Sequence, residues 1–211
     1  MTTDSRMHAP ATERNREAIL TVLKQVLPES AAAPVLEIGS GSGEHVVHFA
    51  QHLPTLQWQP SEATPDPLAS IKAWIDHQGV SNVAPPVVLD VNASPWPIAQ
   101  ACAVLAINVI HYSPWATTAA LLDGAAGLLP EDGVLYLYGP YMRGGAHTAP
   151  SNLAFDGWLK ARDPAFGVRD LDTVVSLAQA RGLALDRVVD MPANNLSVVF
   201  RRAAIRSPAP D

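Results

Sequence analysis

The 211-residue sequence contains one cysteine, Cys102, so no disulfide bond can form within the chain. Cys102 lies in an apolar run, which is typical of a small buried side chain in a reducing compartment. No stretch approaches the roughly 18 consecutive apolar residues of a membrane-spanning helix. Residues 1–16 are polar and lack the apolar core of a signal peptide. We therefore expect a cytoplasmic protein with no membrane contact.

Positive charge is also scarce and dispersed. The chain has 14 Lys and Arg against 20 Asp and Glu, a formal net charge of −6, and its basic residues are scattered apart from Arg201-Arg202. A surface that follows DNA or RNA needs a basic stripe to neutralise phosphates. We therefore expect no nucleic-acid partner.

Hydrophobic residues, in contrast, make up 48% of the chain, enough for one large core. Apolar residues at helical spacing predict helices over 11–27, 44–52, 67–78, 115–129 and 170–181. Short apolar runs predict strands over 34–38, 56–60, 87–89, 104–107 and 133–138, followed by a hairpin of 183–190 and 196–202.

This alternation of strands and helices predicts an α/β fold with a doubly wound, Rossmann-like sheet. We expect seven strands, mostly parallel, with an antiparallel hairpin at the C-terminal end. The folded domain is predicted over residues 11–203. Residues 1–10 and 204–211, the latter rich in proline, are predicted to be flexible tails.

A glycine-rich turn follows the first predicted strand, in the string Glu37-Ile-Gly39-Ser-Gly41-Ser-Gly43. In a doubly wound sheet, ligands bind at the carboxyl ends of the parallel strands, and glycines let the backbone approach them closely. A dinucleotide-binding turn would carry a third glycine at position 44, where this chain has Glu44. A carboxylate at the positive end of a helix suits a pyrophosphate badly.

Carboxylates lie at the ends of the first three strands and match the groups of S-adenosylmethionine (SAM). Glu37 would meet the ammonium group of the methionine end, and Glu62 would accept hydrogen bonds from the ribose hydroxyls. Asp90 would accept a hydrogen bond from the adenine amino group, with Val91 beside the ring. The alternative is an ordinary strand–helix turn with surface acids. The predicted cofactor contacts are Glu37, Gly39, Gly41, Gly43, Glu62, Asp90, Val91 and Asn108.

Candidate acceptor residues follow the later strands. His111 is a possible general base because its unperturbed pKa is near neutral, and Tyr141 could assist it. Either side chain could instead serve only packing or helix entry, and Asn194-Asn195 could be an ordinary turn pair. Residues 141–169 are predicted to form an irregular loop over the acceptor. The predicted substrate pocket comprises Arg14, Asn15, His45, Tyr112, Tyr138, Asn194 and Asn195.

Two chemistries lack their usual residues. His45, His48 and His52 share one helical face, but no carboxylate or cysteine cluster completes a metal site, so we expect no bound metal. We expect His48 and His52 to face solvent, whereas His45 lies next to the glycine turn. The Asn/Asp-Pro-Pro-Tyr/Phe motif of adenine-N6 and protein-amide methyltransferases is absent after the fourth strand. We therefore expect neither of these acceptors.

The chain resembles the methyltransferase-like twenty-six family, a bacterial domain of unknown function, from Glu13 almost to Arg202. The matching strings include Glu13-Arg-Asn15, Leu36-Glu37, Trp58-Gln-Pro-Ser61, Leu89-Asp-Val91, Tyr138-Gly-Pro-Tyr141 and Val189-Asp-Met-Pro-Ala-Asn-Asn195. The resemblance implies a class I methyltransferase fold and SAM binding, but it implies no acceptor. Relatives can have alanine at Gly39 and aspartate at Glu62.

Together these features indicate a SAM-dependent methyltransferase that acts on a small, neutral or cationic acceptor. A non-catalytic SAM-binding or partner-binding protein on the same fold is the first alternative. A nicotinamide-dependent oxidoreductase is the second, and it rests only on the glycine turn and the doubly wound pattern.

Overall fold

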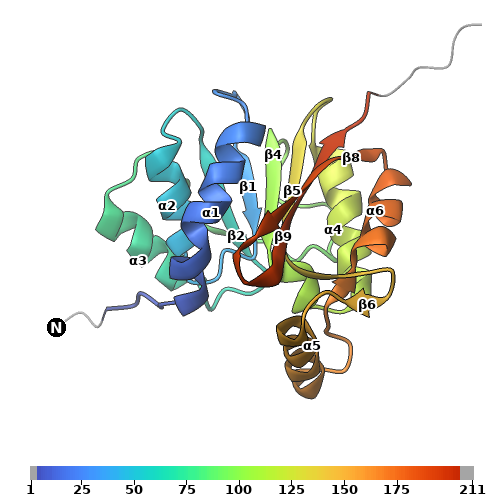
Figure 1. Cartoon of the computed structure of the whole chain (residues 1–211). Coiled ribbons are helices and arrows are strands. Elements are labelled where there is room, and N and C mark those ends of the chain that lie inside the picture. The colour runs from blue at the N-terminus through green and yellow to red at the C-terminus, as the bar shows by residue number, and fades with distance from the viewer. Residues whose placement is uncertain (1–3, 205–211) are drawn as a thin grey trace, which may run out of the picture.

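The computed structural model describes residues 4–204, which form a central sheet between two layers of helices (Figure 1). The main strands follow the order β3-β2-β1-β4-β5-β9-β8. Their bounds are β1 Val35–Ile38, β2 Trp58–Glu62, β3 Val87–Val88, β4 Ala103–Ile107, β5 Val134–Arg143, β8 Leu183–Met191 and β9 Asn195–Arg202. The helices are α1 Pro10–Val26, α2 Glu44–His52, α3 Leu68–Gln78, α4 Trp115–Leu128, α5 Pro150–Arg162 and α6 Leu171–Gln179.

Strand pairing confirms the predicted doubly wound sheet with its closing hairpin. Strands β1 to β5 pair in parallel, whereas β9 runs antiparallel to both β5 and β8. Every residue of β1 and nearly every residue of β4 is buried. This is expected of parallel strands covered on both faces, and it explains why they appear as continuous apolar runs.

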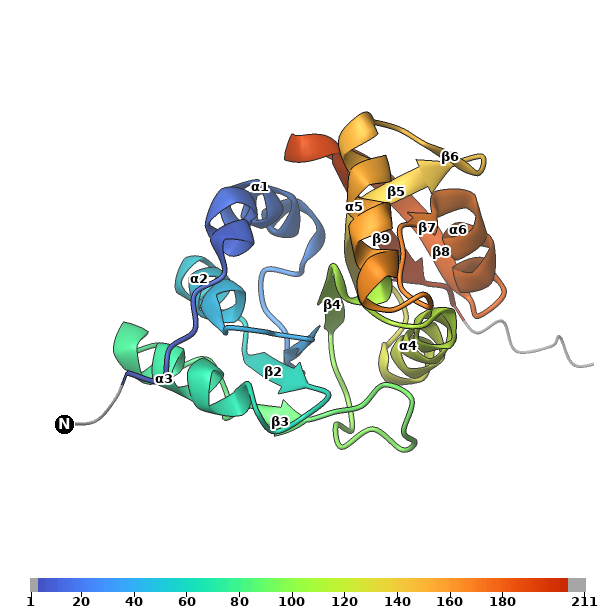
Figure 2. The same cartoon turned by 90° about the horizontal axis from the view of Figure 1, so that it is seen from below.

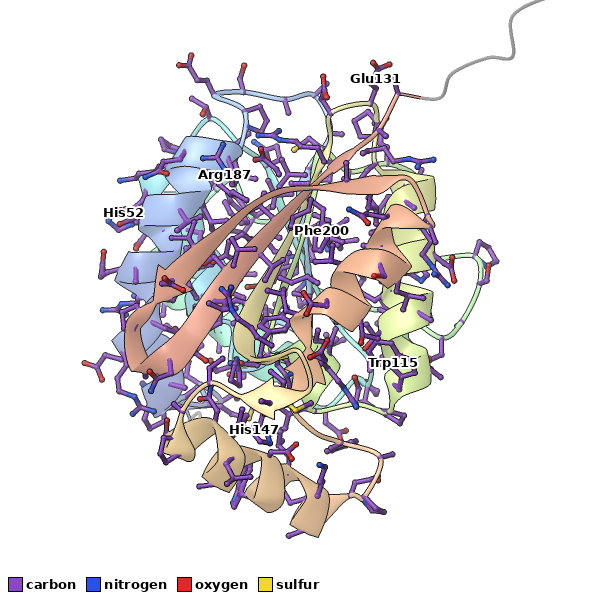
Figure 3. All side chains as sticks on the ribbon, turned by 45° about the vertical axis from the view of Figure 1, so that its right-hand side comes forward. His52, Trp115, Glu131, His147, Arg187 and Phe200 are labelled. Atoms are coloured by element: carbon purple, nitrogen blue, oxygen red, sulfur yellow. The ribbon has the colours of Figure 1, made fainter. Side chains whose placement is uncertain are left out.

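Helices α1, α2 and α3 cover one face of the sheet, and α4 and α6 cover the other (Figure 1). The first layer packs Leu23, Phe49 and Trp58 into one core. The second packs Leu121 and Phe200 into another, and Figure 3 shows Phe200 beneath the helices of that side. Among the described residues, no helix has the length and apolar character needed to cross a bilayer.

The strand order places β1 between β2 and β4, so the connections leave β1 and β4 on opposite sides of the sheet. Such a switch point opens a crevice at the carboxyl ends of the strands. Figure 2 looks onto this edge, where α1 and α5 lie on either side of the end of β4.

The five predicted helices begin and end within two residues of their expected bounds, but the structure corrects two other segments. Strand β2 lies two residues later than predicted, which makes Glu62 its last residue. The segment 141–169 is not an irregular loop. Strand β5 continues to Arg143, short strands β6 (Ala146–His147) and β7 (Arg169–Asp170) pair with its extension, and α5 follows β6.

Buried Asp156 fixes α5 to the rest of the domain. It accepts hydrogen bonds from the Val168 backbone N–H at 2.8 Å and from Lys160 Nζ at 2.6 Å. His147 Nε2 lies 3.4 Å from the same carboxylate, and Figure 3 shows His147 between β6 and α5. Proline at the first position of α5 also favours a helix there.

Part of the predicted N-terminal tail, residues 7–9, contacts the folded domain. Pro10 already belongs to α1. The Met7 N–H donates to Ser70 Oγ at 2.8 Å, and Trp74 Nε1 donates to the Met7 carbonyl at 2.9 Å. The Ala9 N–H donates to Glu44 at 2.7 Å, so residues 7–9 are fastened to α2 and α3. Residues 1–3 and 205–211, which belong to the two predicted tails, lie outside the described part.

Gly43 begins α2 with φ +94°, and a Cβ there would lie 2.7 Å from the Ile71 Cα. We predict that Gly43→Ala destabilises the protein by about 2–4 kcal/mol, because backbone strain adds to a clash with backbone atoms. Urea unfolding measures this change. Gly127→Ala, in α4 where an added Cβ meets nothing within 4 Å, is the control and should be neutral or slightly stabilising. Equal stability of the two variants would contradict the strained turn.

Candidate functional site

Two cavities open at the carboxyl edge of the sheet. The first, here called the turn cavity, has a volume of about 700 Å³ and lies between the glycine turn and the segments that follow β2, β3 and β4. Its lining includes Ile38, Gly39, Gly41, Glu62, Leu89, Asp90, Val91, Asn92, Asn108, Val109, Tyr112 and Phe166. The cavity therefore collects residues from separate strand ends, as the sequence predicts.

The glycine turn is held in a left-handed conformation. Gly39 and Gly41 have φ values of +68° and +58°, which a side chain would oppose. A Cβ on Gly39 would also lie 2.7 Å from the Val109 side chain. The Ser40 N–H donates to the Ser61 carbonyl at 2.9 Å, and Ser61 Oγ donates to the Glu37 carbonyl at 2.7 Å. These bonds fix the turn against the end of β2.

Glu37, the predicted partner of an ammonium group, lies directly under this turn and is only 2% exposed. Burial penalises its charged form and raises its pKa to about 7, and the nearby charge of Glu62 acts in the same direction. Among the described residues, Glu37 Oε2 has no hydrogen-bond partner. A buried, unpaired carboxylate oxygen is costly unless a ligand cation or donor satisfies it.

Glu62 and Asp90 project at the wall of the turn cavity. Glu62 Oε1 accepts a hydrogen bond from the Gly41 N–H at 2.6 Å, so it already touches the glycine turn. Asp90 Oδ1 accepts from the backbone and side chain of Asn92, both at 2.9 Å, and buried Val91 lies beside it. The structure thus brings together all the predicted cofactor residues except Glu37 and Gly43, which lie behind the cavity wall.

The second cavity, here called the helix cavity, has a volume of about 620 Å³ and lies between α1, α5 and the end of β5. It takes in five residues of the predicted substrate pocket: Arg14, Asn15, Tyr112, Tyr138 and Asn195. Asn108 and Tyr112 line both cavities, so the two spaces share a wall. Asn108 holds this position with φ +62°, a conformation that asparagine tolerates better than most residues.

Two other predicted pocket residues support the helix cavity from outside its lining. His45 Nε2 hydrogen-bonds Asn15 Oδ1 at 2.8 Å, and burial lowers the pKa of His45 to about 3. Asn194 Nδ2 donates to Ser151 Oγ at 3.1 Å, and its carbonyl accepts from Asn152 at 3.0 Å. Asn194 therefore joins the hairpin turn to α5.

His111 and Tyr141, the predicted deprotonating pair, line neither cavity. Their exposures are 0% and 1%, and their rings pack edge to face at 5.0 Å between centroids. Burial lowers the pKa of His111 to about 3 and raises that of Tyr141. Gly139 packs closely against the His111 ring, since a Cβ added at Gly139 would lie 2.4 Å from His111 Nε2. In this structure, therefore, neither side chain is exposed to the two cavities.

Helix α5 supplies wall residues that the sequence-based site omitted. Asn152 and Phe155 both line the helix cavity, together with Ser151. Phe155 packs against Tyr112 at 5.8 Å and stacks on Trp158 at 5.7 Å between ring centroids. The three-residue spacing of Asn152 and Phe155 after Pro150 is the signal that could have placed them on one helical face.

Within residues 4–204, no group of three or more His, Cys, Asp or Glu side chains is arranged to hold a metal ion. His48 is buried rather than solvent-facing, and its Nε2 lies 3.3 Å from Glu17 Oε1. His52 Nδ1 hydrogen-bonds the His48 carbonyl at 2.8 Å. The histidine row of α2 is therefore occupied by contacts within the protein.

Residues 6–202 match the family model described as "Protein of unknown function (DUF938)", and the chain belongs to this family. The structure is similar to mitomycin 7-O-methyltransferase MmcR, with a TM-score of 0.77, 18% identity and coverage of 92% of this chain and 54% of that one. It is also similar to an O-methyltransferase family protein from Burkholderia thailandensis, with a TM-score of 0.75 and 17% identity. The match covers 92% of this chain and 58% of that chain.

A further similar structure is CalO1, a methyltransferase in calicheamicin biosynthesis, in its SAH-bound form. Its TM-score is 0.69 at 18% identity, with coverage of 88% of this chain and 54% of that chain. The chain thus spans little more than half the length of these three structures. At such identities the comparison shows the fold, which is that of Rossmann-like methyltransferases.

The raised pKa of Glu37 predicts a pH-dependent cost in the free protein. The carboxyl is neutral in both states below pH 4.5, but between pH 4.5 and about 7 it ionises only in the unfolded chain. We predict that Glu37→Gln leaves stability unchanged at pH 4 and increases it by up to roughly 3 kcal/mol at pH 8. Urea unfolding at both values tests this. Glu131→Gln, at an exposed position, is the control and should leave stability unchanged at both pH values. If Glu37→Gln does not increase the free energy of unfolding at pH 8, the pKa of Glu37 is not raised by burial.

Proposed function

We propose that this chain is a SAM-dependent methyltransferase that transfers a methyl group to a small-molecule acceptor. One observation carries the proposal: Glu62 and Asp90, at consecutive strand ends, line a cavity beside the glycine turn, and this cavity shares a wall with a second one. The resemblance to the methyltransferase-like twenty-six family and the O-methyltransferase names of similar structures support it.

The residues that line the turn cavity fit the ribose and adenine of SAM. Glu37 lies behind the cavity wall, and its unpaired Oε2 would meet the ammonium group of the methionine end through a water molecule. Glu62, now bonded to the Gly41 N–H, would accept the ribose hydroxyls, and Asp90 beside Val91 would receive the adenine. When bound, SAM supplies a methyl group on a positively charged sulfur. Cofactor and acceptor would then meet beside Asn108 and Tyr112, which line both cavities.

Glu44 argues against a nicotinamide dinucleotide. Its carboxylate stands at the start of α2 and accepts hydrogen bonds from the Ala9 N–H and from Ser42 Oγ, at 2.7 and 2.8 Å. A pyrophosphate at this helix N-terminus would meet a fixed negative charge. SAM carries no phosphate, so it avoids this repulsion.

The chain's own contribution to transfer would be to hold the acceptor in line with the methyl group and to exclude water. The helix cavity has the size expected of a small-molecule site. A SAM-binding protein without transferase activity is the second candidate, favoured by the burial of His111 and Tyr141. We place either activity in the cytoplasm, in keeping with the buried single cysteine.

Calorimetric titration with SAM and with its demethylated product SAH tests the cofactor proposal. Both should bind, and NADH should not. Glu62→Ala should weaken SAM binding by roughly 1.5–3 kcal/mol, because one contact with a charged carboxylate is lost. Exposed Asp66→Ala, four residues further on, removes the same charge without lining the turn cavity and should leave the affinity unchanged. Absence of binding by both SAM and SAH, or preference for NADH, would end the proposal.

A further inference from the structure

The wall of the helix cavity contains no side chain suited to remove a proton from an acceptor. Its described lining includes no aspartate, glutamate, histidine, lysine or cysteine. The ionisable groups that face it are Arg14 from α1, Tyr112 from the segment before α4 and Tyr138 from β5. Helix α5 and the turn between β8 and β9 contribute only amide, hydroxyl and apolar side chains. General-base catalysis therefore lacks a residue here.

The neighbouring histidines do not fill this role. His45 lies behind Asn15, and its Nε2 is engaged by the Asn15 amide. His111 is fully buried, and its Nδ1 accepts a hydrogen bond from the Arg169 N–H at 3.3 Å. Burial also raises the pKa of Tyr138, which disfavours its phenolate form.

Arg14 is the one cationic side chain in the described linings of the two cavities. Within residues 4–204, its guanidinium makes no ion pair, which is also true of Arg162, Arg169 and Arg202. Six other arginines of this part pair with acids, such as Arg181 with Asp123 at 2.8 Å. Arg14 is exposed at the cavity wall, and an arginine without a carboxylate partner attracts an anionic ligand.

Three aromatic side chains contribute to the same wall. Tyr112, Tyr138 and Phe155 line the helix cavity, and the rings of Tyr112 and Phe155 lie 5.8 Å apart between centroids. Flat faces of this kind favour a planar ring, which packs in offset or edge-to-face contact. The cavity thus combines a surface for a ring with a single positive charge.

We propose that the acceptor is an aromatic thiol or an acidic phenol that enters the helix cavity already ionised, with Arg14 as its counter-ion. This proposal rests on the proposed methyltransferase function and names the acceptor class. It replaces the neutral or cationic acceptor expected from the net charge of −6, because the charge of the cavity wall outweighs that of the distant surface.

The transfer step then needs no proton acceptor on the protein. The acceptor loses its proton to solvent before it binds. A lone pair on its sulfur or oxygen forms the new bond to the methyl carbon, and the bond between that carbon and the sulfonium sulfur breaks, with its electron pair staying on the sulfur. The products are SAH and the methylated acceptor, so one positive and one negative charge disappear together.

The probe for the test is 4-nitrophenol, whose absorbance distinguishes the phenol from the phenolate. It is titrated with the intact protein saturated with SAH, and its ionisation is followed against pH. The bound probe should ionise at a lower pH than the free probe. Arg14→Gln should abolish this shift and weaken phenolate binding roughly tenfold or more, the loss expected of one charged hydrogen-bonded contact. Arg14→Lys should retain part of the shift because it keeps the charge.

Lys24→Gln, an exposed position on the same helix that lines neither cavity, is the matched control and should match the unmodified protein. SAH affinity is measured separately in each variant. If the unmodified protein binds no SAH, the proposed function fails. If SAH binds but the probe binds as the neutral phenol, or not at all, only the acceptor proposal fails. It also fails if Arg14→Gln weakens SAH and leaves the probe unaffected, because Arg14 then serves the cofactor.

Discussion

The hydrogen bonds between the glycine turn and the end of β2 hold the candidate site together. Ser40 contributes its N–H to the Ser61 carbonyl, and Ser61 in turn donates its hydroxyl to the Glu37 carbonyl. Because β1 pairs in parallel with both β2 and β4, fixing this one turn sets where three strand ends meet. The left-handed glycines and the buried carboxyl of Glu37 are consequences of that arrangement.

The burial of Glu37 lowers the stability of the free protein and would favour binding of a cation beside it. An acid whose pKa is raised to about 7 costs the free protein stability at neutral pH, and a cation beside it would recover that cost. Functional sites commonly hold groups in such unfavourable states. The helix cavity differs in charge, because its lining combines neutral amides and aromatic rings with a single arginine.

Sequence reasoning succeeded where local pattern decides the structure. The glycine turn, the strand-end acids and the parallel order all follow from residues within a few positions of one another. It failed where tertiary packing decides. The close contact between Gly139 and His111 is invisible in the sequence, so His111 was expected at the acceptor. The helix over 150–162 was missed because its buried face includes the polar side chains Asn152 and Asp156, while Leu153 and Trp158 are exposed, so the apolar period is broken.

The two cavities share Asn108 and Tyr112, and the proposed function requires cofactor and acceptor to meet there. A crystal structure of the protein with SAH would locate the cofactor. The adenine should lie beside Asp90 and Val91, the ribose should contact Glu62, and the sulfur should face Asn108 and Tyr112. SAH bound elsewhere, or with its sulfur turned away from the helix cavity, would disprove methyl transfer between these two cavities.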